Sequence, residues 1–592
     1  MRRLSLTDTG FLLTEKRETP MHVAGLHLFT LPEDADEHEF LHSLADSLRA
    51  TDEFQPPFGD RLKVGPLGLL GPVHWEADKS LDIDYHVRHA ALPQPGRYRE
   101  LFALVSRLHS QLMDRDRPLW TIHLIEGLQN RQFAIYMKFH HAAIDGVRGI
   151  HLTQSMYSAD PEERMRYSPL SVQAAETYQK GLGLGLATSE EPPTERQLAN
   201  VAEVVKAGFD SSVHILGALR RVAGAWTDPA SPLMVPWRRV PHSPINTKVD
   251  GARRFVAQSW PFARIRAVGK ALDGTFNDAV LAMCSGALRR YLTDAGGLPT
   301  ESLKAMVPIS LRRPDDLESS NAVGAISADL ATNLRDPIRR FSSIQASMQA
   351  GKQMFQELSP VEAQLVMQVF QMPLLFLDSL GLTARFPPYS TVISNVPGPR
   401  QQLYWNGAKL EGIYPASIVL DGFALNITLV SVADHVDFGI TACRRTLPQI
   451  QRFIDHLEDA LVELEEATGL TGATDRPATR KSRSAAGKPA KKKKKTSASS
   501  RKSTKKKTRS GAGKSTKKRG RSSTKKAAKK KTRSSARKVA KKKARSSGKK
   551  VAKKKTRGSA KKVAKKKART SGKKPVRKKA RRKTAAKKGR RS

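Results

Sequence analysis

A twelve-residue repeat rich in lysine, alanine and serine fills the end of this chain and limits what the chain can fold into. Four copies follow one another from Thr532: TRSSARKVAKKK, ARSSGKKVAKKK, TRGSAKKVAKKK and ARTSGKKPVRKK. Residues 471–592 carry 57 Lys and Arg against one acid, Asp475, a net charge of +56. Such a segment has too few large apolar side chains to offset the entropy lost on ordering. We expect it to be disordered in isolation.

The charge of the remaining chain has the opposite sign. The formal net charge of +49 for all 592 residues is typical of a nucleic-acid binder, but residues 1–470 hold 47 bases and 54 acids, a net charge of −7. The basic tail can neutralise phosphates by counterion release, whatever the base sequence. We therefore predict a polyanionic partner for residues 471–592, with DNA, RNA, polyphosphate and anionic membrane all open. A solvated tail without a dedicated partner is the alternative.

Cysteine usage and apolar runs indicate the cellular setting. Cys284 and Cys443 are too few for a disulfide framework or a metal cluster, which fits a reducing cytoplasm. The basic N-terminus does not predict secretion, because Asp8 and Glu15 interrupt the apolar core of a signal peptide. Residues 363–377 are shorter than the ~18 residues that a membrane span needs, and they contain three glutamines and a proline. We expect a buried or surface-lying helix there.

Hydrophobic periodicity divides residues 1–470 into two halves that each mix strands with helices. The first half shows strand patterns at 22–30, 119–128 and 132–140, and helix patterns at 36–50 and 98–113. The second half shows strand patterns at 253–260, 304–311, 390–396, 417–422, 423–432 and 435–444, and helix patterns at 276–292 and 447–467.

We therefore predict an α/β protein with four segments. These are a first lobe at 1–167, a helical crossover at 168–249, a second lobe at 250–470 and the basic tail at 471–592. Two α/β lobes with a connector favour a pseudo-twofold arrangement whose active site lies at the seam between them.

The segment KFHHAAIDGVRG, residues 138–149, is the most informative motif for chemistry. A strand that ends at His140 and His141 directs the two side chains to opposite sides of the sheet, so only one can face a cleft. Asp145 and Gly146 permit a sharp turn that holds that ring in place. A fixed imidazole can take a proton from a hydroxyl and return it to a leaving group near neutral pH.

The histidine pair also has two non-catalytic interpretations. Both rings can be core histidines with satisfied hydrogen bonds, which is the usual case for a lone His. Metal ligation is disfavoured, because adjacent strand residues point apart and no HxH or HxxxH partner completes a tetrahedral set. We accordingly predict no metal at this site.

HHAAIDG resembles the active-site motif of the coenzyme A-dependent acyltransferase superfamily, which includes chloramphenicol acetyltransferase and the condensation domains of peptide synthetases. Further stretches resemble the bacterial wax ester synthase/diacylglycerol acyltransferase family, in the same order: LSLTDTGFLLTEKRETPMHVAGL, DYHVRHAALPQPG, PLW, FNDAVLA, VPISLR and SNVPGP. The likeness spans about residues 4–467 and leaves out the tail. It implies two chloramphenicol-acetyltransferase-like lobes joined by a helical crossover.

The resemblance implies transfer of a fatty acyl group from acyl-CoA to diacylglycerol or to a long-chain alcohol, giving triacylglycerol or wax ester. It implies no cofactor besides the co-substrate acyl-CoA, and no acyl-enzyme. His141 would be the general base that deprotonates the acceptor hydroxyl, with His140 in a supporting position. Asp145 would orient the loop by pairing with a buried arginine, for which Arg312 is the candidate, and Gly146 would close the turn.

The tetrahedral oxyanion of such a reaction needs a hydrogen-bond donor, whose loss typically costs about 2.7–4 kcal/mol. Asn277, Ser394 and Asn395 are the candidates, and Trp120 is a candidate substrate contact. Each position also fits a purely structural role. Asn277 lies at a predicted helix start, SNVPGP can shape a turn after a strand, and Trp120 can pack at a strand entry.

Two rival functions stay open. His140 and Asp145 also form the HxxxxD signature of glycerolphosphate and lysophosphatidate acyltransferases, but the Glu-Gly-Thr-Arg block of those enzymes is absent from the sequence. A non-catalytic lipid or CoA binder, tethered to the nucleoid or to lipid granules by its tail, is the alternative from another class. We predict a cytoplasmic location at the inner face of the membrane or at lipid inclusions, with the nucleoid as a further location that the tail would direct.

Overall fold

The computed structural model describes residues 2–470, apart from 52, 67, 145–148, 150–151, 153–154, 165–166, 182–209, 229, 311–322 and 357. The described residues all belong to one compact unit, Met1–Ser482. The predicted tail at 471–592 lies outside the described residues, and so do Asp145, Gly146 and Arg312 of the predicted site.

The first of two six-stranded sheets carries the histidine pair. Its strand order is β12-β13-β2-β7-β6-β5. The strands are β12 Tyr404–Trp405, β13 Ala408–Ala416, β2 His22–Thr30, β7 Gln132–His140, β6 Trp120–Glu126 and β5 Val87–Ala91. All nine residues of β7 are buried. Because side chains cover both faces of this central strand, its sequence is a nearly continuous apolar run rather than an alternating one.

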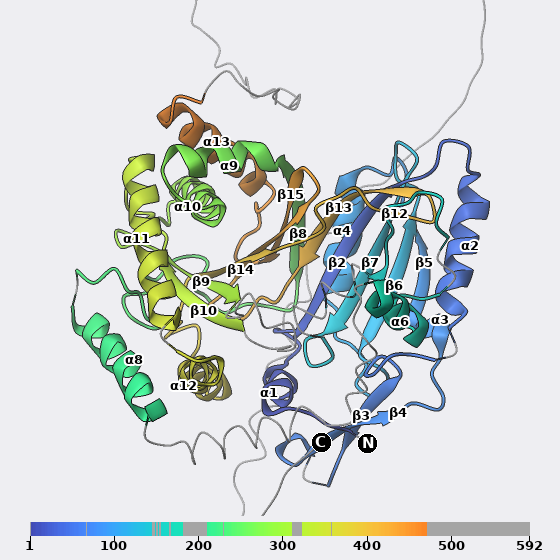
Figure 1. The fold of residues 1–592 in the computed structure, drawn as a ribbon, viewed down its shortest axis with the longest axis horizontal. Coiled ribbons are helices and arrows are strands. Elements are labelled where there is room, and N and C mark those ends of the chain that lie inside the picture. Colours follow the sequence, from blue (N-terminus) through green and yellow to red (C-terminus); the bar gives the residue numbers. More distant parts are fainter. Residues whose placement is uncertain are drawn as a thin grey trace, which may run out of the picture. The chain divides into compact units, whose positions relative to one another are not determined.

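The second sheet has the order β10-β9-β11-β14-β15-β8. Its strands are β10 Val323–Asp329, β9 Lys304–Ser310, β11 Thr391–Val396, β14 Leu425–Val432, β15 His435–Cys443 and β8 Arg253–Pro261. β11 runs parallel to both of its neighbours, β9 and β14, and the other pairs are antiparallel. Figure 1 shows the two sheets side by side, with helices on their outer faces.

The second half of the chain donates two strands to the first sheet. β13 pairs antiparallel with β2, from Lys409 opposite Thr30 to Ala416 opposite Ala24. The predicted boundary at residue 250 therefore does not separate the two sheets. Without β13, β2 would present an unpaired edge. The strand predicted at 417–422 is also wrong, since in this segment only Leu420 forms an isolated bridge, with Phe423.

Helices cover both sheets, and a small third sheet lies at the N-terminus. The helices around the first sheet are α1 Leu6–Thr14, α2 Glu37–Arg49, α3 Ile83–His86 and α4 Tyr98–His109. The predicted crossover contains α6 Val172–Gly181 and α8 Asp210–Thr227. The helices of the second lobe are α9 Phe262–Ala271, α10 Phe276–Asp294, α11 Pro337–Gln356, α12 Pro360–Ser379 and α13 Arg452–Ala467. The third sheet contains β1 Arg2–Arg3, β4 Val73–Ala77 and β3 Asp60–Val64, in that order, and a 3-10 turn, η1, spans Gly68–Leu70.

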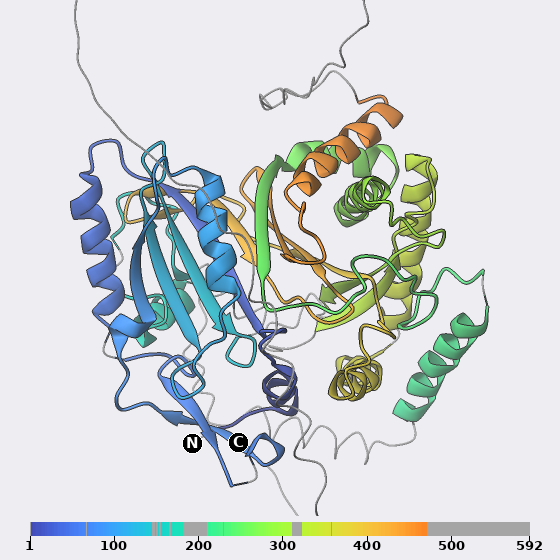
Figure 2. The ribbon, with the colours of Figure 1, turned by 180° about the vertical axis from the view of Figure 1, so that it is seen from behind.

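A shared apolar cluster joins the two lobes. Phe255 and Ala257 of β8 pack against Leu26 of β2 and Val105 of α4 in one buried core. Seen from behind, β8 and β13 run along this junction (Figure 2). The junction fixes the first sheet against the second, so residues from distant parts of the sequence meet near the end of β7.

α12 occupies the segment at 363–377 and lies at the surface of the second lobe. Ala363 and Val366 are buried, whereas Val369 and Phe376 are 54% and 65% exposed. Within the described part of the chain, no helix is both long enough and apolar enough to cross a membrane.

Candidate active site

β7 ends at the histidine pair and separates the surroundings of the two rings. The N–H of His140 donates to the carbonyl of Leu119, and the N–H of His141 donates at 2.9 Å to the carbonyl of Met21. His140 is fully buried, opposite His22 in the strand register. His141 begins the turn and is half-buried. The two residues thus differ in burial.

The His140 ring is held in a fixed orientation beside a buried carboxylate. Its Nδ1 accepts the N–H of Ala142 at 3.1 Å, so the ring proton resides on Nε2. Nε2 faces Oε1 of Glu15 at 3.4 Å, a long polar contact rather than a well-aligned hydrogen bond. His140 therefore has a fixed orientation and no exposure to solvent, which suits a supporting role.

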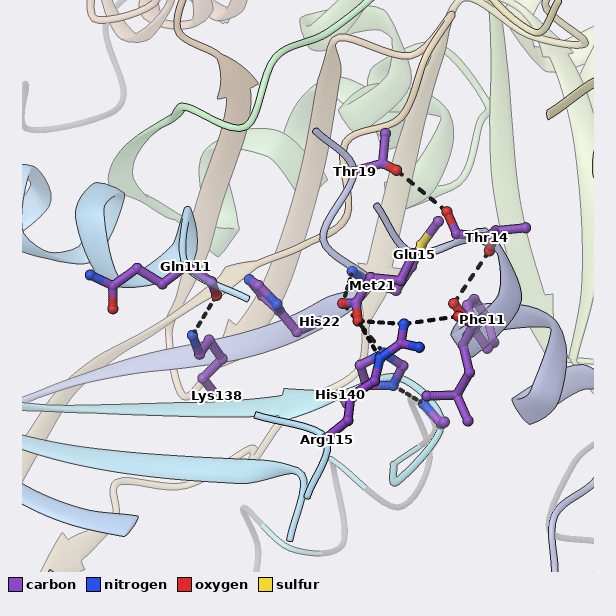
Figure 3. Close-up of polar contacts among 12 residues, drawn as sticks. Phe11, Thr14, Glu15, Thr19, Met21, His22, Gln111, Arg115, Lys138 and His140 are labelled. Atoms are coloured by element: carbon purple, nitrogen blue, oxygen red, sulfur yellow. Dashed lines mark hydrogen bonds and ion pairs between the residues drawn. The ribbon is translucent and has the colours of Figure 1, made fainter. Parts of the chain in front are cut away.

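Glu15 connects several parts of the site, as Figure 3 shows. Its Oε1 accepts the N–H of Met21 at 2.9 Å, and its Oε2 accepts Nη2 and Nε of Arg115 at 2.8 and 3.2 Å. Burial raises the pKa of this carboxyl, but the interactions with His140, Met21 and Arg115 outweigh burial and lower the pKa to about 2. Glu15 is therefore a carboxylate at neutral pH. Through Met21 it also supports the backbone of His141.

Helix α1 supports the second ring directly. The ring of Phe11 stacks on that of His141, with centroids 4.2 Å apart and planes 14° apart. The side chain of Ser5 caps the helix by accepting the N–H of Asp8 at 3.0 Å, an interaction typically worth about 1 kcal/mol. Arg115 closes the other end, because its Nη2 donates to the carbonyl of Leu12 at 2.8 Å. α1 is thus fixed at both ends while Phe11 lies against the accessible imidazole.

The N-terminal segment from Glu15 to Met21, which supports the histidines, also contacts the second lobe. Nζ of Lys16 pairs with Asp378 of α12 at 2.8 Å. Nη2 of Arg253, at the start of β8, donates to the carbonyl of Glu18 at 2.7 Å. The support of the site therefore lies at the junction of the lobes, where the sequence predicted an active site.

Several further histidines of the first lobe are neutral core residues. Burial lowers the pKa of His27 and of His109 to about 3, and that of His123 to about 4. Burial also lowers the pKa of His22, whose Nε2 lies 2.7 Å from the carbonyl of His109. The non-catalytic interpretation that was considered for the histidine pair, a core histidine, therefore fits these other histidines. His141 differs from them because it is half-buried rather than buried.

The predicted oxyanion donors lie in the second lobe. Asn277 is half-buried in the first turn of α10, a helix capped by Thr275 and Asp278. Ser394 and Asn395 lie on β11, and the buried Oδ1 of Asn395 has no hydrogen-bond partner in the described chain. Among the described residues, no hydrogen bond joins any of the three to either histidine of the pair.

Trp120 is a core residue, so its prediction as a substrate contact is corrected. Its side chain is 1% exposed, and Nε1 donates to the carbonyl of Phe58 at 2.7 Å. The indole also stacks on His86, with ring centroids 4.5 Å apart. Packing and this hydrogen bond occupy the side chain, which leaves no surface for a substrate.

Sequence reasoning missed the roles of Glu15, Arg115 and Phe11. Glu15 and Phe11 belong to a stretch that carries the family resemblance, but Glu15 served only as an argument against a signal peptide. A carboxylate in an otherwise apolar stretch, FLLTE, was the available signal, because such a group needs partners when it is buried. Arg115 lies in the polar segment DRDRP and gives no signal of this kind.

The arrangement is suited to acid–base chemistry by one imidazole. His141 is half-buried and is held through its backbone and its ring, and the buried carboxylate of Glu15, which pairs with Arg115, supports it through Met21. In the parts of the chain that the structure describes, no group of three His, Cys, Asp or Glu side chains is placed to hold a metal ion.

Comparison with known proteins identifies two family domains and several relatives. Residues 4–280 match the wax ester synthase/diacylglycerol acyltransferase catalytic domain, and residues 319–465 match the C-terminal domain of the same family. A putative diacylglycerol O-acyltransferase of Mycobacterium bovis is 43% identical over 470 residues, covering 78% of this chain and 98% of the relative. O-acyltransferase WSD of Acinetobacter baylyi is 40% identical over 466 residues, covering 78% and 96%.

A solved structure agrees with these relatives. The wax ester synthase/diacylglycerol acyltransferase from Marinobacter aquaeolei VT8 has a TM-score of 0.62 and 39% sequence identity, covering 79% of this chain and all of that chain. This structural match confirms the predicted fold class, and the two family domains and the relatives show an acyltransferase. The chain therefore belongs to the wax ester synthase/diacylglycerol acyltransferase family.

Proposed function

We propose that this enzyme transfers a fatty acyl group from acyl-CoA to diacylglycerol or to a long-chain alcohol, with His141 as the general base. The observation that carries the proposal is the half-buried His141 ring at the end of β7, stacked on Phe11 and held by Met21. The names of its relatives, diacylglycerol O-acyltransferase and wax ester synthase, support both acceptor classes.

The reaction proceeds by direct transfer between the two substrates. His141 takes the proton of the acceptor hydroxyl while the oxygen attacks the thioester carbonyl. The tetrahedral intermediate collapses with cleavage of the C–S bond, and the imidazolium returns the proton to the departing CoA sulfur. No acyl-enzyme forms, and acyl-CoA is a co-substrate rather than a cofactor. Asn277, Ser394 and Asn395 stay candidates for the oxyanion donor.

The neighbouring groups position the base. Glu15 holds the His140 ring and, through Met21, the backbone of His141. We assign the same kind of role to Asp145 with its candidate partner Arg312, and to Gly146 in the turn. A base displaced by about 1 Å loses on the order of a hundredfold in rate, so these contacts matter without touching a substrate.

The experiment offers labelled palmitoyl-CoA with diacylglycerol and with hexadecanol in separate reactions. We expect labelled triacylglycerol, wax ester or both, together with free CoA. Mass spectrometry of the enzyme mixed with palmitoyl-CoA alone should find no acylated protein. Palmitoyl-CoA binding without either product would instead favour the non-catalytic lipid or CoA binder.

The tail supports a second function, electrostatic attachment to DNA or to anionic membrane, because residues 471–592 carry a net charge of +56. A chain that ends at residue 470 should keep its turnover and lose salt-sensitive binding to both polyanions. Unchanged affinity for both would contradict this function. We propose a cytoplasmic enzyme at the inner face of the membrane or at lipid inclusions, with DNA binding as the route to a nucleoid location.

A further inference from the structure

α12 is apolar on two faces, and only one of them has a partner in the described part of the protein. The inner face consists of Ala363, Val366, Met367 and Phe370, which pack on the core of the second lobe. The outer face consists of Val369, Pro373, Phe376 and Leu380, which follow one another at steps of four, three and four residues and are exposed. Side chains at this spacing lie on one side of a helix. We call these four residues the outer α12 face.

Exposed apolar side chains also occur on elements next to α12. Val369, Phe376 and Leu380 are 54%, 65% and 54% exposed, values that are unusual for clustered apolar side chains. Both ribbon views place α1 beside α12, and α1 packs against α12 and contributes the exposed Leu13. Phe386 follows α12 in the chain and is also exposed.

Cationic groups lie among these apolar side chains. The guanidinium of Arg385 is exposed and lies 5.6 Å from the ring centre of Phe386. Nζ of Lys16 is exposed and bridges to Asp378 of α12. An apolar helix face with nearby Arg and Lys is the pattern of helices that lie in a membrane interface, where acyl chains receive the apolar groups and phosphates attract the cations.

We propose that the outer α12 face, with Leu13 and Phe386, docks the enzyme on a phospholipid membrane. This inference deepens the proposed function, because it rests on acceptors that are dissolved in lipid. α1, which packs against α12, links the two sites within a few residues: Leu13 is exposed, Leu12 is buried and Phe11 stacks on His141. Docking through this face therefore leaves the imidazole of His141 separated from the lipid surface by helix α1.

The test uses the full chain and vesicles of phosphatidylcholine alone at high salt, so that the basic tail contributes little attraction. We expect the wild-type chain to co-sediment with the vesicles. The double variant Phe376→Ser/Leu380→Ser should bind about tenfold more weakly, because it loses two large apolar side chains from the interface. Thermal unfolding of each variant checks that the fold is retained.

A matched control is Tyr98→Ser. Tyr98 is 47% exposed, but it lies at the start of α4, where its hydroxyl donates to Gln132. Gln132 begins β7 and His140 ends it, so this control lies at the opposite end of the strand from the site. It should bind vesicles as the wild-type chain does.

Three results would overturn the docking surface. One is a wild-type chain that does not bind these vesicles, and another is a double variant that binds as well as the wild-type chain. The third is a wild-type dimer that the double variant converts to a monomer in light scattering, which would make this face an interface between two copies.

An activity arm separates the docking surface from the proposed function. With diacylglycerol dissolved in the vesicles, turnover by the double variant should fall about tenfold, whereas turnover of a water-soluble short-chain alcohol should match that of the wild-type chain. A wild-type chain that binds vesicles but acylates neither acceptor would defeat the proposed function and leave the docking surface standing.

Discussion

β7 of the first lobe and β15 of the second occupy equivalent places in two sheets with the same local order. In the first sheet, β5 runs parallel to β6, and β6, β7 and β2 follow in antiparallel pairs. In the second sheet, β11 runs parallel to β14, and β14, β15 and β8 follow in antiparallel pairs. Both strands have nine residues and are almost entirely buried.

The two strands differ in what meets their C-terminal ends. β15 ends at Cys443, whose N–H donates to the carbonyl of Ala424 and whose carbonyl accepts the N–H of Leu447, so its end is closed within the second lobe. β7 ends at His140, where Glu15 and Met21 arrive from the N-terminal segment. The strand order is therefore repeated in the two sheets. At the end of β7, the N-terminal segment with Glu15 and Met21 supplies the groups that hold the histidine pair.

The largest expected effect comes from removing the accessible ring at the end of β7. His141→Ala should lower kcat about a thousandfold, the usual contribution of a general base, without a change in the melting temperature. Cys443→Ala makes the matched change at the end of β15 and should leave kcat unaltered. Product formation from labelled palmitoyl-CoA measures both. If the kcat of His141→Ala were within tenfold of the wild-type value, His141 would not be the general base, and the ends of β7 and β15 would not differ in chemistry.

Removing the carboxylate that reaches β7 should have the next largest effect. Glu15→Gln should lower kcat up to about a hundredfold through displacement of the base, with the KM for acyl-CoA unchanged. Glu76→Gln, which changes a partly exposed carboxylate paired with Lys63, serves as the control. A loss of stability without a loss of kcat would show that Glu15 only supports the fold.

The same variant should change the response to acid. The folded-state pKa of Glu15 is about 2, below its ordinary value of 4.5. The stability that this carboxylate contributes is therefore present above about pH 4.5 and is lost as the pH falls toward 2, by up to about 3 kcal/mol. Urea unfolding of the wild-type chain and of Glu15→Gln between pH 4.5 and 2 measures how the free energy of unfolding of each depends on pH.

A smaller effect is expected where the two sheets approach each other. A Cβ on Gly439 of β15 would overlap the carbonyl oxygen of Pro415 in β13, the strand that the first sheet receives from the second half. Gly439→Ala should lower the free energy of unfolding by about 2 kcal/mol, because backbone must move. Gly217→Ala, at a helical position with open space around it, should be neutral or slightly stabilising. Equal effects of the two substitutions would contradict the close approach.

The smallest expected effect at neutral pH concerns a histidine of the first lobe that takes no part in the chemistry, because its contribution appears only in acid. Nε2 of His109 lies 3.1 Å from the carbonyl of Ser417, and burial lowers its pKa to about 3, against an ordinary value of 6.5. Below pH 6.5 the unfolded chain binds a proton at His109 that the folded chain does not bind. The free energy of unfolding therefore decreases as the pH is lowered from 6.5 toward 3. His109→Gln should reduce this slope by about 1.4 kcal/mol per pH unit. Unfolding at several pH values tests it, and an unchanged slope would show that His109 is protonated in the folded chain.

Local patterns predicted many elements of the fold. β2 and β7 have the bounds predicted from their sequences, and α10 begins at the predicted residue. β13 was missed, because its sequence AKLEGIYPA contains Gly and Pro, and its pairing with β2 joins segments far apart in the chain. The strand predicted at 417–422 failed for the related reason that an apolar run does not show which edge is available for pairing.

The sequence by itself determined the acidic character of residues 1–470, the basic character of the tail, the family and the histidine pair, because charge, periodicity and contiguous motifs are local properties of a chain. Only the tertiary structure decided which of the two histidines is accessible and that Trp120 belongs to the core. It also decided that Glu15, Arg115 and His140 meet, since a carboxylate becomes a positioning group only after folding has removed it from water and surrounded it with partners.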